Sequence, residues 1–121
     1  MREGNVVADK SLEFAVRVVK LHKCLSERGC AFVLCNQILK SGTSIGANIR
    51  EGVFAQSRND FVAKLSIALK EVSETEYWLE VLLKAEHLKP SEYVSLQRDC
   101  GEIAKLLIAT LKKTRQSQQE A

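Results

Sequence analysis

Three polar residues stand inside stretches that otherwise repeat apolar residues at helical spacing: Asn48, Glu51 and Glu74. Asn48 and Glu51 are three positions apart and therefore share one face of a helix, while Glu74 belongs to the next such stretch. A buried carboxylate is costly unless it is hydrogen-bonded or paired. The three residues fit either an acid–base or two-metal site or a polar network that fixes the register of two helices. We expect the inter-helix network and no enzymatic activity.

Possible metal ligands are not spaced as known metal sites require. Di-iron bundles place a Glu three residues before a His on two helices, and neither His22 nor His87 has such a Glu. The four cysteines include no Cys-x-x-Cys pair. We therefore expect no metal or other cofactor, and we expect free thiols that act as small apolar groups in a reducing cytoplasm.

Two glycines four positions apart, Gly42 and Gly46, suggest either a phosphate-binding loop or close packing of helices. A phosphate loop needs a preceding strand and a terminal Gly-Lys-Ser/Thr, and the sequence has neither. Small residues on one helix face let a neighbouring backbone approach closely. We expect the packing role.

Basic residues recur every seven positions near both ends of the chain, although the net charge is only +3. The candidate phosphate-binding residues are Lys10, Arg17, Lys20, Arg98, Lys105 and Lys112. Such lines suit contacts to a nucleic-acid backbone that read no base sequence and weaken with salt. No aromatic platform of the kind that binds single strands accompanies them.

The elements that must hold these residues are four helices, predicted over residues 9–28, 31–55, 58–87 and 91–113 of one domain, residues 1–121. Asp9 is the predicted first cap, Gly29 the end of the first helix and Ser57 the cap of the third. Short connections favour an all-α, antiparallel up-down-up-down four-helix bundle. No stretch is apolar for long enough to span a membrane, so we expect a cytoplasmic protein without membrane contact.

The third helix carries two apolar stripes, whereas the core of one bundle needs one. The predicted core stripe consists of Phe61, Leu65, Ala68, Val72, Thr75, Leu79 and Leu82. The predicted oligomer interface lies on the adjacent face and includes Ile67, Glu71, Trp78 and Val81. In the first helix, Leu12, Val16 and Val19 form a broad apolar arc with Phe14, Val18 and Leu25.

The central motif resembles a known bacterial family. The residues that carry the resemblance are SIGANIREG over positions 44–52, then Ser57, Phe61, Leu65, Ile67–Leu69 and Glu74. The chain resembles, over nearly its whole length, the four-helix bundle proteins encoded in 23S ribosomal RNA intervening sequences. A related branch is the accessory variability protein of diversity-generating retroelements, a partner of their reverse transcriptase. Gly46 departs from the proline, and Lys70–Glu71 from the Gly-Ser pair, that many members carry.

The resemblance implies a homopentameric barrel with no known catalytic activity, and in the retroelement branch it implies binding of RNA and DNA through basic surface. We accordingly expect a non-enzymatic accessory protein that binds structured RNA or RNA–DNA hybrid duplex. The alternative is a scaffold that docks an RNA-handling enzyme, such as a reverse transcriptase, and has no nucleic-acid affinity of its own.

Overall fold

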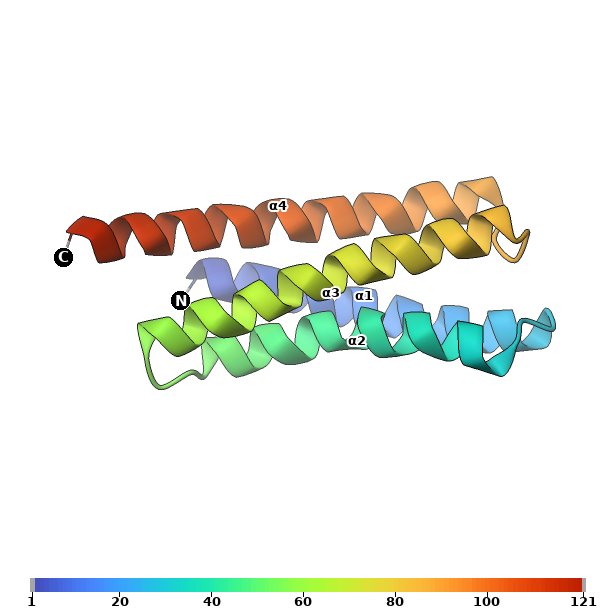
Figure 1. Ribbon diagram of the computed structural model, residues 1–121, viewed down its shortest axis with the longest axis horizontal. Helices are drawn as coiled ribbons and strands as arrows, with labels where there is room; N and C mark the ends of the chain where they lie inside the picture. Colours follow the sequence, from blue (N-terminus) through green and yellow to red (C-terminus); the bar gives the residue numbers. More distant parts are fainter. Residues whose placement is uncertain (1, 121) are drawn as a thin grey trace.

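The computed structural model describes residues 2–120, with side chains described for residues 6–117. The helices are α1 (Arg2–Glu27), α2 (Phe32–Val53), α3 (Arg58–Lys84) and α4 (Pro90–Glu120), and the described residues contain no strand. Figure 1 shows them side by side, with the two termini and the α2–α3 turn at one end of the bundle. The prediction of an all-α antiparallel bundle is confirmed.

Each helix packs along its two neighbours, and within the described residues no Cα atoms of the diagonal pairs α1–α3 and α2–α4 come within 8 Å of each other. The most extensive contacts are α2–α3 and α1–α2, and α1–α4 is the least extensive. The bundle is therefore a square of helices in which α1 and α3 occupy opposite corners.

The two outer helices are longer than the sequence predicted. α1 begins at Arg2, not at a cap on Asp9, because Val7 is fully buried and its packing stabilises the first turns. α4 runs to Glu120, not to residue 113. Thr110 and Leu111 are still buried, and the Thr114 hydroxyl donates to the Thr110 carbonyl at 2.8 Å, so the helix continues past its last core residue. The inner helices are shorter than predicted by a few residues.

The turns follow the sequence signals, with one exception. Gly29 has φ +80°, the left-handed conformation expected just after a helix. Ser57 caps α3 as predicted, its hydroxyl accepting from the Asp60 N–H at 3.1 Å. At the end of α3 the same left-handed conformation falls on Glu86, with φ 65°, where no glycine marks the position.

The core stripe of α3 is the predicted one, whereas half of the apolar arc predicted for α1 lies outside the core. All seven predicted core residues of α3 are buried. In α1, Phe14, Val18 and Leu25 are buried as expected. The other members of the predicted arc, Leu12, Val16 and Val19, are instead 51%, 47% and 53% exposed. They lie two positions from the core stripe, which turns them about 200° around the helix and away from the core.

Candidate nucleic-acid interface

The outer face of α4 carries an exposed line of bases. Arg98, Lys105 and Lys112 are seven residues apart, so they lie one above another on the helix, and all three are exposed. None of the three has an ion-pair partner among the described side chains. Residues 103–117, which include Lys105 and Lys112, contain no Asp or Glu, whereas Arg98 precedes Asp99 and lies one turn from Glu102.

The predicted bases of α1 are arranged differently. Lys10 pairs with Glu102 of α4 at 3.4 Å, and Arg17 pairs with Asp99 at 2.6 Å and donates to the Ser95 hydroxyl at 3.1 Å. These two side chains hold α1 against α4 and are not available as unpaired positive charge. Lys20 is exposed on α1. The seven-residue spacing was equally regular in both helices, and only the packing of α1 against α4 distinguishes them.

A third ion pair extends the same α1–α4 contact to the far end of the bundle. Arg28 donates from its two terminal guanidinium nitrogens, Nη1 and Nη2, to Glu92, at 3.0 and 2.8 Å, and Glu92 also accepts from the Lys89 N–H at 2.9 Å. The hydrogen bond from Arg28 is the main cause that lowers the pKa of Glu92 from its ordinary value, and it raises the pKa of Arg28. The α1–α4 contact therefore depends on charge along its whole length.

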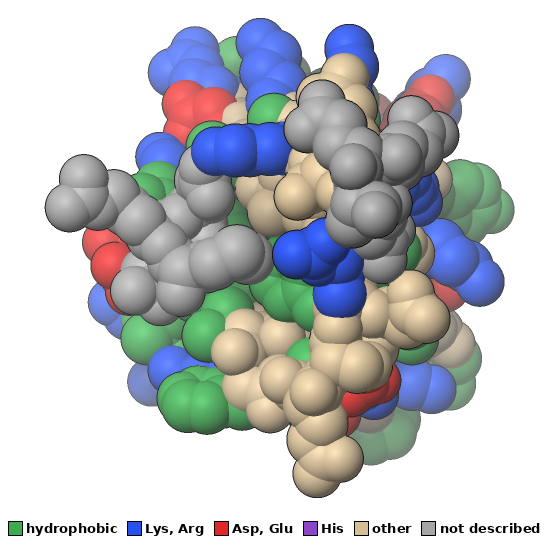
Figure 2. Space-filling view, turned by 90° about the vertical axis from the view of Figure 1, so that its left-hand side faces the viewer, with side chains coloured by type: hydrophobic (Ala, Val, Ile, Leu, Met, Phe, Trp, Pro, Cys, Tyr) green, Lys and Arg blue, Asp and Glu red, His purple; other side chains and the backbone are tan. Residues whose placement is uncertain are grey.

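The end of the bundle that holds the α2–α3 turn gathers further bases. Figure 2 looks onto this end and shows Lys and Arg side chains around its rim, more numerous toward α4, with few acidic ones between them. A cleft of about 460 Å³ opens here between the turn and the last turns of α4. It is lined by Gly52, Val53, Ala55, Gln56, Ser57, Arg58, Phe61, Thr110, Lys113, Thr114 and Ser117.

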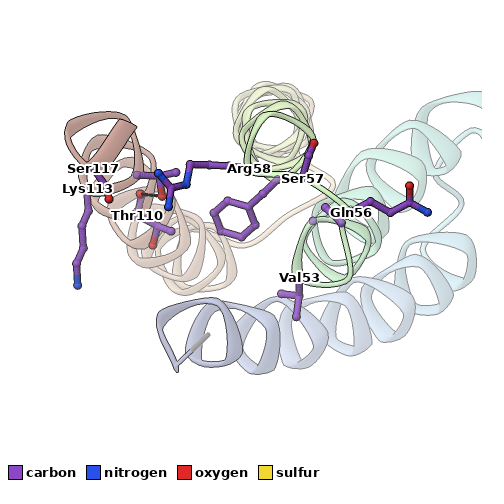
Figure 3. A pocket seen from close by; sticks show the side chains of 11 residues that line it. Val53, Gln56, Ser57, Arg58, Thr110, Lys113 and Ser117 are labelled. Atoms are coloured by element: carbon purple, nitrogen blue, oxygen red, sulfur yellow. Dashed lines mark hydrogen bonds between the residues drawn. The ribbon is translucent and has the colours of Figure 1, made fainter. Parts of the chain in front are cut away.

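The cleft joins an apolar floor to positive charge. Figure 3 shows Arg58 reaching from the start of α3 toward Thr110 of α4. The Thr110 and Thr114 hydroxyls donate to carbonyls one turn earlier, at 2.8 Å each, which leaves their oxygens as acceptors. The lining includes Arg58 and Lys113 and no Asp or Glu, so the cleft offers positive charge to an anionic group. Sequence analysis missed Arg58 and Lys113, although the run without acids was a visible signal.

Asn48, Glu51 and Glu74 are not brought together. The Asn48 amide donates to the Ser44 carbonyl of its own helix at 2.8 Å, and Glu51 forms an ion pair with Lys64 of α3 at 3.2 Å. Glu74 is exposed. Its neighbour Thr75 lies opposite Ser41, about 10 Å along the bundle from Asn48. The residues thus supply one exposed inter-helix ion pair, and they do not form an acid–base site.

The two predicted packing glycines lie inside α2, so this stretch is not a phosphate loop. A Cβ at Gly42 would be 2.8 Å from Val18 Cγ2, and one at Gly46 would be 3.3 Å from the Ser11 carbonyl oxygen. Both glycines face α1. Gly52, which sequence analysis did not single out, makes the same kind of approach to α3, where a Cβ would be 2.6 Å from Leu65 Cδ1.

The α3 face predicted as an interface is partly covered in the single chain. Ile67 is 41% exposed, while Glu71, Trp78 and Val81 are half-buried. Burial is the main cause that raises the pKa of Glu71, Glu74 adds to it, and Lys40 and Lys70 oppose it. The Trp78 indole N–H is buried without a hydrogen-bond partner among the described groups.

The buried thiols of Cys30 and Cys100 are unreactive. Burial, with the nearby charges of Glu76 and Asp99, raises the pKa of Cys100 to about 12, so it stays a neutral thiol. Burial also raises the pKa of Cys30. Within the described part of the chain, no three His, Cys, Asp or Glu side chains gather as metal ligands would. Over the same residues, no helix is both long and apolar enough to cross a membrane.

Comparison with known proteins identifies the family. The fold is similar to a crystal structure of a protein with unknown function from the S23 ribosomal protein family of Bacteroides thetaiotaomicron. The two sequences are 58% identical, the match covers 91% of this chain and 98% of that one, and the TM-score is 0.88. No similar sequence is found among the curated proteins. The model of the 23S rRNA-intervening sequence proteins matches residues 3–109, and the chain therefore belongs to that family.

Proposed function

We propose that this protein is a non-enzymatic, homopentameric bundle that binds the phosphate backbone of structured RNA or RNA–DNA hybrid duplex without reading sequence. It acts in this proposal as an accessory to an RNA-handling enzyme. The observation that carries the proposal is the unpaired line Arg98–Lys105–Lys112 on α4, beside a run of residues without acids. Phosphate contacts of this kind need positive charge on a rigid surface and no base-reading groups.

Assembly multiplies this modest charge. One chain offers three aligned bases on α4, and a closed ring repeats them around its axis. The bases of α1 contribute less than the sequence suggested, because Lys10 and Arg17 are paired with α4. The bundle end adds Arg58 beside the 460 Å³ cleft, so a nucleic acid lying along α4 would meet positive charge at that end as well.

The test is binding of a structured RNA to the purified oligomer by fluorescence anisotropy, titrated across salt. Arg98→Ala with Lys105→Ala should weaken binding and reduce the salt dependence by about one counterion per lost contact, with the oligomer intact. The matched control is Lys84→Ala with Lys89→Ala, which removes the same charge from exposed positions at the other end of the bundle. Equal affinity of the Arg98/Lys105 variant and the wild type at low salt would refute the assignment to α4.

A second candidate is a scaffold that docks a basic RNA-handling enzyme, such as a reverse transcriptase. The favouring observation is on α3, where Glu74 and Glu80 are exposed in the single chain beside Tyr77, itself 58% exposed, and this candidate requires that surface to be free of other copies of the chain. Absence of RNA binding even at low salt, together with capture of such an enzyme that is lost in a Glu74→Lys variant, would favour this function over the first.

A further inference from the structure

α1 presents an apolar face that the single chain leaves uncovered. Leu12, Val16 and Val19 repeat at the spacing of the core stripe but on the opposite side of the helix, and each is about half exposed. An amphipathic helix of a monomeric bundle needs one apolar stripe, facing the core. A second, outward stripe marks a contact with another surface.

α3 presents the other exposed apolar face. Ile67 is 41% and Tyr77 58% exposed, and the ring of half-buried Trp78 packs edge-on against Tyr77, with centroids 5.0 Å apart. Because α1 and α3 occupy opposite corners of the bundle, their outer faces point in roughly opposite directions. Two different faces on opposite sides suit a head-to-tail contact, in which the α1 face of one copy meets the α3 face of the next.

The two faces lie at the same height along the bundle. Gly42 of α2 faces Val18, and the preceding residue of α2, Ser41, accepts a hydrogen bond from Thr75 at 3.0 Å. Val18 is therefore level with about residue 75, and since α1 and α3 run in the same direction, residues 12–19 are level with about residues 69–76. In a ring whose axis follows the bundle, neighbouring copies are rotated without a shift, so surfaces of equal height meet.

The charges beside the two faces are complementary at these heights. Three pairs of charged residues on neighbouring copies lie at equal height, within about one helical turn: Glu13 and Lys70, Lys20 and Glu74, and Lys23 and Glu80. All six side chains are exposed in the single chain, and each pairing brings opposite signs together. A shift by half the length of the helices would lose these pairings, so charge fixes the same register as the apolar contact.

We propose that a second copy of this chain covers the α1 face, through Leu12, Val16 and Val19 docked head-to-tail on the α3 face around Ile67 and Tyr77. This inference rests on the self-association within the proposed function and assigns its surfaces. Lys20, one of the residues considered for nucleic acid, belongs in this proposal to the contact between copies.

Cross-linking between two chains that each have one exposed cysteine tests the proposal. Both chains carry Cys24→Ser, which removes the exposed native thiol, and one also carries Val16→Cys and the other Glu74→Cys. We expect a short bismaleimide to give covalent dimers when the two chains are mixed and reassembled, and none with either chain alone. Dimers of the Val16→Cys chain alone would indicate a symmetric contact and overturn the proposal. Mixed chains that stay oligomeric without cross-linking would overturn it as well.

Exchanging the charges of Lys20 and Glu74 gives a second test. Because both positions are exposed, we expect the variants to fold. Lys20→Glu should raise the dissociation constant of the oligomer about fivefold, and adding Glu74→Lys should restore it. Lys105→Glu makes the same charge change on α4 and should leave assembly unchanged. If Lys20→Glu weakens assembly no more than Lys105→Glu, the pairing is wrong. Light scattering of the wild-type chain distinguishes failure of this contact from failure of the proposed assembly, because a monomer would refute the assembly itself. RNA binding is measured independently of both.

Discussion

The contact between α1 and α2 at Gly42 gives the sharpest prediction about the fold. A methyl group there would lie 2.8 and 2.9 Å from the two γ-carbons of Val18 and 3.2 Å from its Cβ. Val18 is fully buried and β-branched, so it has one strongly preferred rotamer in a helix and little freedom to move aside. Gly42→Ala must therefore push α1 away from α2 or strain Val18.

The magnitude follows from two opposing effects. Overpacking a close-packed core costs about 1–3 kcal/mol, whereas replacing a helical glycine by alanine gains about 1 kcal/mol of helix propensity. We expect a net loss of up to about 2 kcal/mol in the free energy of unfolding. Gly101 provides the matched control, because it lies inside α4 and a Cβ there would meet nothing within 4 Å. Gly101→Ala should gain the full propensity of about 1 kcal/mol.

The assay is urea unfolding followed by circular dichroism, with all chains at the same protomer concentration, since unfolding of an oligomer depends on concentration. Both variants replace glycine by alanine, so the difference between their changes in the free energy of unfolding isolates the packing contribution. A Gly42→Ala protein as stable as Gly101→Ala would show that α1 and α2 do not approach as closely as described. Val18→Ala added to Gly42→Ala should relieve the overpacking, and the two changes should be strongly non-additive.

Two further predictions concern the ends of the helices. The pKa of Glu92 is lowered in the folded chain, so its pairing with Arg28 contributes stability that is present above the ordinary value of 4.5 and is lost as the pH falls through the lowered pKa. Glu92→Gln should flatten the acid limb of a stability–pH curve, and a curve of unchanged shape would contradict this. Glu86 adopts φ 65° at the end of α3, a conformation that glycine adopts without strain. Glu86→Gly should therefore raise the free energy of unfolding by about 1 kcal/mol, whereas Gly29→Ala, at φ +80°, should lower it; equal effects would refute the conformational argument.

Sequence predicted the helices and one core stripe well because both are local. The seven-residue stripe of α3 is buried as predicted, and it repeats at helical spacing without a break from Phe61 to Leu82. α1 was ambiguous because two apolar stripes with the same spacing run along opposite sides, and periodicity alone cannot say which one faces inward.

The candidate site was harder to predict because it depends on relations between helices. Whether Arg17 is free or paired depends on Asp99, which is 82 residues away along the chain. Asn48 and Glu74 could be grouped only by assuming a register for α2 against α3, and Ser41 and Thr75 fix a different one. Arg58 and Lys113 meet at a cleft only because α4 extends to the α2–α3 turn.

The chain itself closes only three sides of the square of helices. Turns join α1 to α2, α2 to α3 and α3 to α4, whereas no segment links α4 back to α1. That fourth side has the least extensive packing and is bridged by Lys10–Glu102, Arg17–Asp99 and Arg28–Glu92. It is the natural place for the bundle to part without unfolding as a whole, and salt would ease that opening by screening the bridges. In hydrogen exchange, the amides of α1 and α4 should lose protection before those of α2 and α3.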